Sequence, residues 1–164
     1  MAKCDMNEFY EIVNEYITHP KVLEMKNYMH HGINRYDHSF NVAYYTYRVT
    51  KRLNLNYKSA TKAAMLHDFF LGEVKQKNGY SRLLIHPFYA VQNSKKYFKI
   101  NKMEEDIIKH HMFPITPIPP MSIEGWIVDI CDDIASVKER GLATTKNILS
   151  YAKVFALFLL TIIK

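Results

Sequence analysis

The chain has 164 residues, enough for one domain with a single hydrophobic core. Hydrophobic residues make up 48% of it and charged residues 23%, a composition that excludes an intrinsically disordered chain. The net charge is +6, but Lys and Arg are scattered singly or in pairs such as Lys51-Arg52 and Lys95-Lys96. Because such pairs are ordinary features of solvated helix faces, the charge predicts neither a nucleic-acid duplex nor a membrane surface as partner.

The cysteines and the apolar segments indicate the cellular compartment in which the protein is expected. Only two cysteines are present, Cys4 and Cys131, whereas a small secreted domain normally has a larger disulfide framework. The first residues contain no apolar stretch of the kind found in signal peptides. The longest apolar run, Val154 to Ile163, is about half the length that a bilayer crossing requires. We therefore expect a cytoplasmic protein without a membrane segment.

The first half of the chain has helical periodicity. Phe9, Ile12, Val13 and Tyr16 recur at spacings of three and four, which predicts a helix over 7–16. A short helix over 22–28 and a loop over 30–34 are expected next. A long helix, capped by Asp37 or Ser39, should then run to Leu53. Ser59 should open a further helix, over 60–70, whose mainly apolar surface predicts a central position in the fold.

The second half continues the helical pattern. After a polar loop, helices are expected over 87–98, starting at Pro87, and over 102–111, with Glu104, Glu105 and Asp106 at its positive end. The proline-rich segment 114–120 cannot be helical. A strong helix over 123–139 follows, and a weaker one over 144–163. With five glycines and six prolines in the whole chain, the fold class predicted is all-α.

Residues able to bind a metal recur at the ends or on the apolar faces of successive predicted helices. They are His38, His67, Asp68, His86, His110, His111 and Asp129. Inward-facing side chains from several helices can converge on one point in a bundle, and nitrogen and oxygen ligands suit Fe, Mn, Zn, Co or Ni. A histidine on an apolar face is more often a core residue bonded to a carbonyl, so no single member carries the interpretation. Asp129 does need a partner, because a lone charge in an apolar helix is costly.

The dipeptide His67-Asp68 sets a geometric condition on such a site. Adjacent residues on a helix point about 100° apart, so these two can share a metal only if it lies beside the end of the helix. The carboxylate of Asp68 can also bridge two metals.

The pattern resembles the HD superfamily of metal-dependent phosphohydrolases, which has a His, then His-Asp, then a distant Asp on consecutive helices. The residues that carry the resemblance span about 35–135 and are Tyr36-Asp37-His38-Ser39-Phe40-Asn41-Val42-Ala43, Ala63-Ala64-Met65-Leu66-His67-Asp68 and Ile127-Val128-Asp129. His86-Pro87 and His110-His111 are similar in type and order to the second-metal histidines of the HD-GYP-like subset. The chain has Met112-Phe113-Pro114 in place of the Gly-Tyr-Pro signature, so cyclic-dinucleotide specificity is not implied.

The resemblance implies a single-domain helical bundle over 1–164, of about six to eight helices, with an apolar last helix over 144–164. It implies that His38, His67, Asp68 and Asp129 surround a first metal. Asp68 would bridge to a second metal held by His86 and by His110 or His111, of which His111 is preferred. Phe69-Phe70-Leu71 after the dyad departs from many relatives and leaves the general acid unassigned.

The function predicted is hydrolysis of a phosphoester in a nucleotide or another small phosphorylated substrate, by a water activated by one or two divalent transition metals. Besides the dyad His67-Asp68, Arg35 and Lys75 are candidate catalytic residues, since a cation near the metals would neutralise phosphate charge. The alternative is a regulatory module that binds metal and nucleotide without catalysis. Whether the apolar C-terminal stretch packs on its own core or drives a homodimer is left open.

Overall fold

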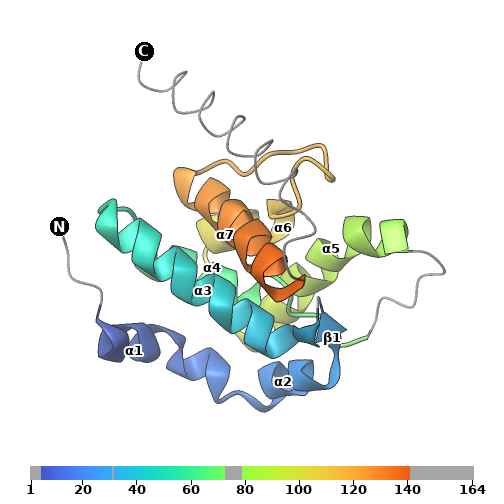
Figure 1. Ribbon diagram of the computed structural model, residues 1–164, viewed down its shortest axis with the longest axis horizontal. Coiled ribbons are helices and arrows are strands. Elements are labelled where there is room, and N and C mark those ends of the chain that lie inside the picture. The colour runs from blue at the N-terminus through green and yellow to red at the C-terminus, as the bar shows by residue number, and fades with distance from the viewer. Residues whose placement is uncertain (1–4, 31, 73–78, 141–164) are drawn as a thin grey trace.

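The computed structural model describes residues 5–30, 32–72 and 79–140, and within them the fold is all-α apart from one very short hairpin (Figure 1). The elements are α1 (Met6–Ile17), α2 (Pro20–Leu23), the 3-10 helix η1 (Glu24–Asn27), β1 (Met29–His30), β2 (Ile33–Asn34), α3 (Arg35–Arg52), α4 (Tyr57–Leu66), α5 (Gly79–Tyr97), α6 (Lys102–His110) and α7 (Ile123–Arg140). The predicted fold class is thus confirmed. The C-terminal helix predicted over 144–164 lies outside the described residues.

Helix α4 is at the centre of the fold. It packs against α1, α3, α6 and α7, and its fully buried residues include Ala60, Ala63 and Ala64. Small side chains such as these let neighbouring helices approach closely while the larger Met65 and Leu66 fill the space between them. Because α4 leads directly into His67 and Asp68, this packing fixes the dyad in the middle of the molecule.

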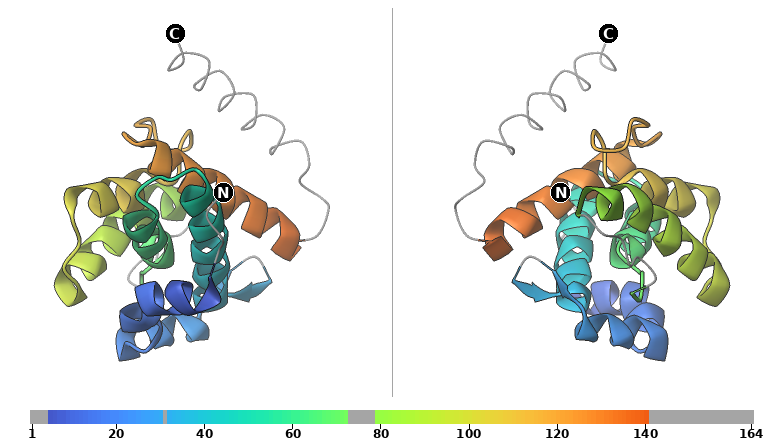
Figure 2. Two further views of the ribbon diagram at one scale, coloured as in Figure 1. Left: turned by 90° about the vertical axis from the view of Figure 1, so that its left-hand side faces the viewer. Right: turned by 90° about the vertical axis from the view of Figure 1, so that its right-hand side faces the viewer.

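The other helices surround α4 on several sides. Helices α3 and α7 lie against each other and run in opposite directions, so the C-terminal end of α7 meets the N-terminal end of α3 (Figure 1). Figure 2 shows α1 and α2 as a layer beneath α3. Phe9, Ile12, Val13 and Tyr16 bury the inner face of α1, as its periodicity predicts.

Several predicted boundaries are wrong, for identifiable reasons. The cap of α3 is Asn34, whose side chain accepts a hydrogen bond from the Asp37 amide at 2.9 Å. Likewise, Asn56 rather than Ser59 caps α4, which starts three residues earlier than expected and ends at Leu66 instead of Phe70. Helix α5 runs through Pro87. The φ of proline is compatible with a helix, although the residue removes one backbone hydrogen bond and its ring crowds the preceding turn.

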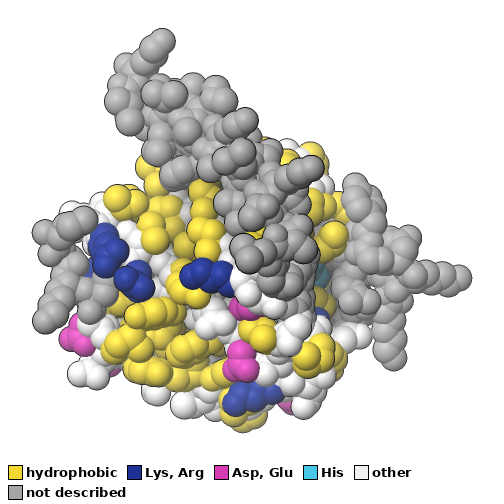
Figure 3. Space-filling view, in the orientation of Figure 1, with side chains coloured by type: hydrophobic (Ala, Val, Ile, Leu, Met, Phe, Trp, Pro, Cys, Tyr) yellow, Lys and Arg dark blue, Asp and Glu magenta, His cyan; other side chains and the backbone are white. Residues whose placement is uncertain are grey.

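The face shown in Figure 3 carries hydrophobic side chains over α1 and α3. Among the described residues, Met6 and Tyr10 on α1, Val49 on α3 and Leu53 just after α3 are each at least 39% exposed. Scattered exposed hydrophobic residues are normal on soluble domains, so this face does not identify a partner. None of the described helices is both long and apolar enough to cross a membrane.

Candidate metal centre

Six side chains able to bind a metal converge in the core from five parts of the fold. They are His38 on α3, His67 and Asp68 just after α4, His86 on α5, His111 just after α6, and Asp132 on α7. They form three overlapping groups, His38-His67-Asp68, His67-His111-Asp132 and Asp68-His86-His111, and the ligand atoms within each group lie within 4.8 Å of one another. The cluster is therefore continuous, with Asp68, His67 and His111 each shared by two groups.

The end of α4 separates the two residues of the dyad. The Nδ1 of His67 donates to the carbonyl of Ala64 at 2.7 Å, because a carbonyl can only accept. In the neutral ring this bond leaves the lone pair on Nε2, which is buried without a hydrogen-bond partner in the described structure. Asp68 faces other partners: its Oδ1 lies 3.2 Å from the Nε2 of His86 and 3.9 Å from the Nε2 of His111.

His111 follows the last residue of α6 and is held in the same way as His67. Its Nδ1 donates to the Ile108 carbonyl at 2.7 Å, and its Nε2 lies 3.0 Å from the Nε2 of His86. Burial, together with the nearby His67 and His86, lowers the pKa of His111 to about 3. A neutral His111 that donates through Nδ1 presents the lone pair of its Nε2 to His86.

His38 lies between two carboxylates. Its Nε2 is 2.8 Å from Asp132 Oδ1, and its Nδ1 is 2.7 Å from Glu139 Oε2. Burial alone would lower the pKa of His38, but the hydrogen bonds to Asp132 and Glu139 outweigh it and raise the pKa to about 10. Burial would raise the pKa of Asp132, but its bond to His38 and the other nearby histidines hold that pKa well below its usual range. The Asp132 Oδ1 also lies 3.7 Å from His67 Nε2.

Two residues predicted as ligands lie outside these groups. Asp129 is buried one turn before Asp132 on α7 and belongs to none of the ligand groups found in the described residues. Burial, with the nearby Asp133 and Asp132, raises the pKa of Asp129 well above its usual value. His110 bonds instead through Nδ1 to Asp106 at 2.8 Å, on its own helix. In the described structure Asp132, and not Asp129, is the α7 carboxylate that belongs to a ligand group, while the roles assigned to Asp129 and His110 remain predictions.

Of the two residues predicted to bind substrate phosphate, the structure describes one. Arg35 is only 5% exposed; it donates to the carbonyl of Phe70 and its guanidinium lies 3.5 Å from the centroid of the Phe70 ring. That ring in turn packs on the imidazole of His86, with centroids 5.2 Å apart. Arg35 therefore helps to fix the chain that follows Asp68. Lys75 lies outside the described residues.

Sequence reasoning missed Asp132 and Glu139, although their spacing carries a signal. The two residues are seven apart on α7, which is two helical turns, so their side chains share a face. The same argument applies to Asp129 and Asp132, which are three apart. Periodicity thus shows that these acids lie on one side of the helix but not which of them reaches the histidines.

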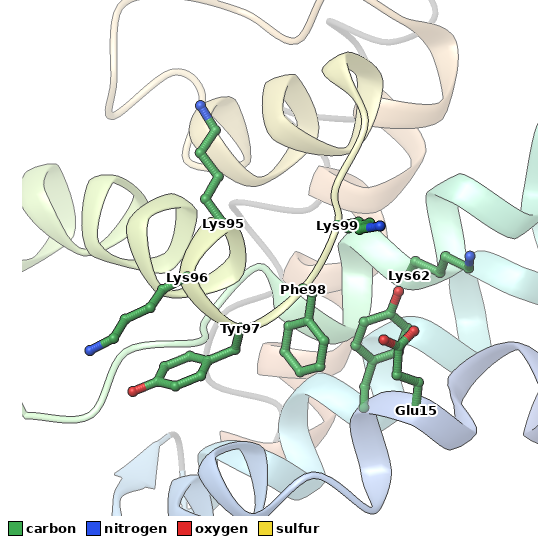
Figure 4. A pocket seen from close by; sticks show the side chains of 8 residues that line it. Glu15, Lys62, Lys95, Lys96, Tyr97, Phe98 and Lys99 are labelled. Atoms are coloured by element: carbon green, nitrogen blue, oxygen red, sulfur yellow. The ribbon is translucent and has the colours of Figure 1, made fainter.

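A groove on the surface is separate from the cluster. It is an open groove of about 550 Å³ lined by Glu15, Tyr16, Lys62, Lys95, Lys96, Tyr97, Phe98 and Lys99 (Figure 4). No residue of the metal-binding cluster lines it. The amines of Lys95 and Lys96 point away from those of Lys62 and Lys99, and Lys95 is paired with Glu105 at 2.5 Å. The lysines therefore do not converge on one anion.

The comparison with protein families agrees with this geometry. The model of the HD domain matches residues 35–136, well over half of the chain. The chain belongs to the HD-domain family. Members of this family are generally metal-dependent hydrolases. No curated protein and no solved structure matches the chain.

The residues of this HD domain fit divalent metal ions. The Nε2 of His67 is buried and has no hydrogen-bond partner among the described residues. Two further imidazole nitrogens face each other at 3.0 Å, an arrangement that requires a proton or a cation between them. Imidazole and carboxylate donors without thiolates suit first-row transition metals. Cys131, the cysteine on α7, is outside the ligand groups, and burial raises its pKa to about 12.

Proposed function

We propose that this HD-domain protein hydrolyses a phosphoester in a nucleotide or another small phosphorylated substrate, and that it does so with two divalent metal ions. The observation that carries the proposal is the convergence of six nitrogen and oxygen donors, among them His67, whose Nε2 has no hydrogen-bond partner in the described structure. Membership of a family of metal-dependent hydrolases supports the same reaction class.

The proposed ligands divide into two sets. His38, His67, Asp68 and Asp132 would hold one ion, and Asp68, His86 and His111 the other. Asp68 is the proposed bridge, because it belongs to one ligand group with His38 and His67 and to another with His86 and His111. The backbone bonds to Ala64 and Ile108 support this assignment, since they turn the Nε2 lone pairs of two histidines into the cluster.

The protein contributes positioning and exclusion of water to the reaction. The chemistry that bound divalent ions supply is Lewis acidity toward phosphate oxygens and a lower pKa for a water molecule. Each of the six donors is at least partly buried, and five of them are in the core, so their charges act in a medium with little screening. Arg35 and Phe70 hold the segment after Asp68 in place against His86.

The test is turnover of a panel of nucleotide and simpler phosphoesters by metal-free protein to which Mn²⁺, Fe²⁺, Co²⁺ or Ni²⁺ is added back. Substitutions His67→Ala and Asp68→Ala should each reduce turnover more than about 100-fold, because loss of even an outer partner of a ligand costs about 10- to 100-fold. His19→Asn is the matched control: His19 caps α2 through a bond from the Lys21 amide, a role that asparagine fills.

Turnover together with metal content separates the main proposal from its alternative. Element analysis of the purified protein should give two metal ions per chain. A metal-loaded protein that binds nucleotides but turns over none of the panel would contradict the hydrolase proposal and favour a regulatory module. A protein that takes up none of the four metals would contradict both.

A further inference from the structure

The nitrogen of His38 that points away from the cluster is bound to a side chain. Its Nδ1 lies 2.7 Å from Glu139 Oε2, and the other carboxylate oxygen of Glu139 accepts a bond from Asn41 Nδ2 at 3.0 Å. His38 is fully buried, and the Glu139 side chain is 8% exposed. The contact therefore joins two buried groups, with the carboxylate held at both oxygens.

His38 differs in this respect from two of its neighbours in the cluster. The Nδ1 atoms of His67 and His111 bond to backbone carbonyls three residues earlier in the chain, which any sequence would provide. The Nδ1 of His38 is bound instead by the side chain of Glu139, about 100 residues later in the chain. Changing Glu139 therefore removes the partner of Nδ1 and leaves the contact of Nε2 with Asp132 in place.

The backbone at Glu139 is itself held near α3. Gly32, in the turn between β1 and β2, has a φ of +96°, and a Cβ added there would lie 3.3 Å from the Glu139 carbonyl oxygen. The hairpin thus packs directly on the end of α7, where that helix meets the start of α3 (Figure 1). Glu139 also lies beyond residues 35–136, the part of the chain that matches the HD domain, so the contact is not part of that match.

We propose that Glu139 is a positioning residue for the metal centre: by accepting the Nδ1 proton of His38, it turns the Nε2 lone pair of that ring toward the ion. A carboxylate partner fixes the tautomer and the orientation of a ligating imidazole and makes it a stronger donor. Asn41 orients the carboxylate in turn. The inference rests on the proposed function, because it requires that His38 bind a metal.

The test is a Co²⁺ titration of metal-free, full-length protein against a competing chelator, with the visible absorption spectrum of bound Co²⁺ as a second readout. Glu139→Gln should weaken Co²⁺ binding about 10- to 100-fold and change the spectrum. The control Glu11→Gln removes the same charge from an exposed position on α1 and should leave both unchanged. A purely structural role would lower the melting temperature without altering the spectrum.

The outcomes distinguish this inference from the proposed function. If the wild-type protein binds Co²⁺ and Glu139→Gln binds it within about threefold as tightly with the same spectrum, the inference is wrong and the proposed function stands. If the wild-type protein binds no Co²⁺, both are wrong. Should Glu139→Gln fail to fold, Asn41→Ala decides: affinity should fall about fivefold, the equivalent of one ordinary hydrogen bond, and unchanged affinity would overturn the inference.

Discussion

Two carboxylates one turn apart on α7, Asp129 and Asp132, provide a sharp test of the site geometry. Asp132 Oδ1 lies 2.8 Å from the Nε2 of His38 and 3.7 Å from that of His67, whereas Asp129 is in no ligand group of the described structure. Substitution by asparagine preserves the size of either side chain and removes its charge. We expect Asp132→Asn to impair metal binding and Asp129→Asn to leave it intact.

The expected magnitude follows from linkage between binding and unfolding. A metal ion at 100 times its dissociation constant stabilises the folded protein by about 2.7 kcal/mol, or roughly 5–11 °C in melting temperature for a domain of this size. If Asp132→Asn weakens binding about 100-fold, the same Mn²⁺ concentration gives only about 0.4 kcal/mol, or roughly 1–2 °C. Asp129→Asn should show the full wild-type shift in a thermal melt with and without Mn²⁺.

The metal-free protein supplies an independent readout for Asp129. Burial, together with Asp133 and Asp132, raises the pKa of Asp129 above 3.8, so the folded state disfavours its charged form. The wild-type protein should match Asp129→Asn below about pH 4 and lose stability relative to it as the pH rises through the folded pKa. Loss of the Mn²⁺ shift in Asp129→Asn, or a melting temperature below that of wild type at neutral pH, would refute this interpretation.

Two further predictions concern α6 and the segment that follows it. His111→Ala should reduce the metal content, measured by element analysis, from two ions per chain to one. His110→Ala should keep both ions and lower the melting temperature, because His110 bonds to Asp106. The reverse pattern of metal contents would contradict the assignment. Gly125→Ala should destabilise the fold by about 1–3 kcal/mol, since the added Cβ would lie 2.6 Å from Pro120 Cβ. A melting temperature equal to that of the wild-type protein would contradict this prediction.

The sequence was sufficient for the fold class because helical periodicity is a local property. The four apolar residues of α1 were identified from spacing alone, and all four are buried. The boundaries were less accurate, since they depend on single hydrogen bonds. Asn34 and Asn56 each satisfy backbone amides at a helix start, and nothing in the composition distinguishes them from Ser59 or Asp37, which can form the same bonds.

Most of the side chains that the structure brings together in the cluster can be named from the sequence. His38, His67, Asp68, His86 and His111 were all named from the sequence, because they recur near helix ends in a recognisable order. Asp132 was not named from the sequence, because Asp129 is the acid that stands within an apolar run. The choice between two acids on one face depends on how α7 is rotated against α3. That rotation is set by tertiary packing, which a helical period does not report.

The backbone at the end of α4 shows how adjacent residues can face different members of the cluster. On a continuous helix, His67 and Asp68 would point about 100° apart from a common axis. Because α4 ends at Leu66, the chain turns immediately, with the Phe69 and Phe70 amides bonding to the carbonyls of Leu66 and Asp68. His67 then faces Asp132 at 3.7 Å while Asp68 faces His86 at 3.2 Å. His67 itself keeps helical angles, with φ −56° and ψ −35°, so the two side chains diverge much as they would on a continuous helix, and this divergence lets adjacent residues face different members of the cluster.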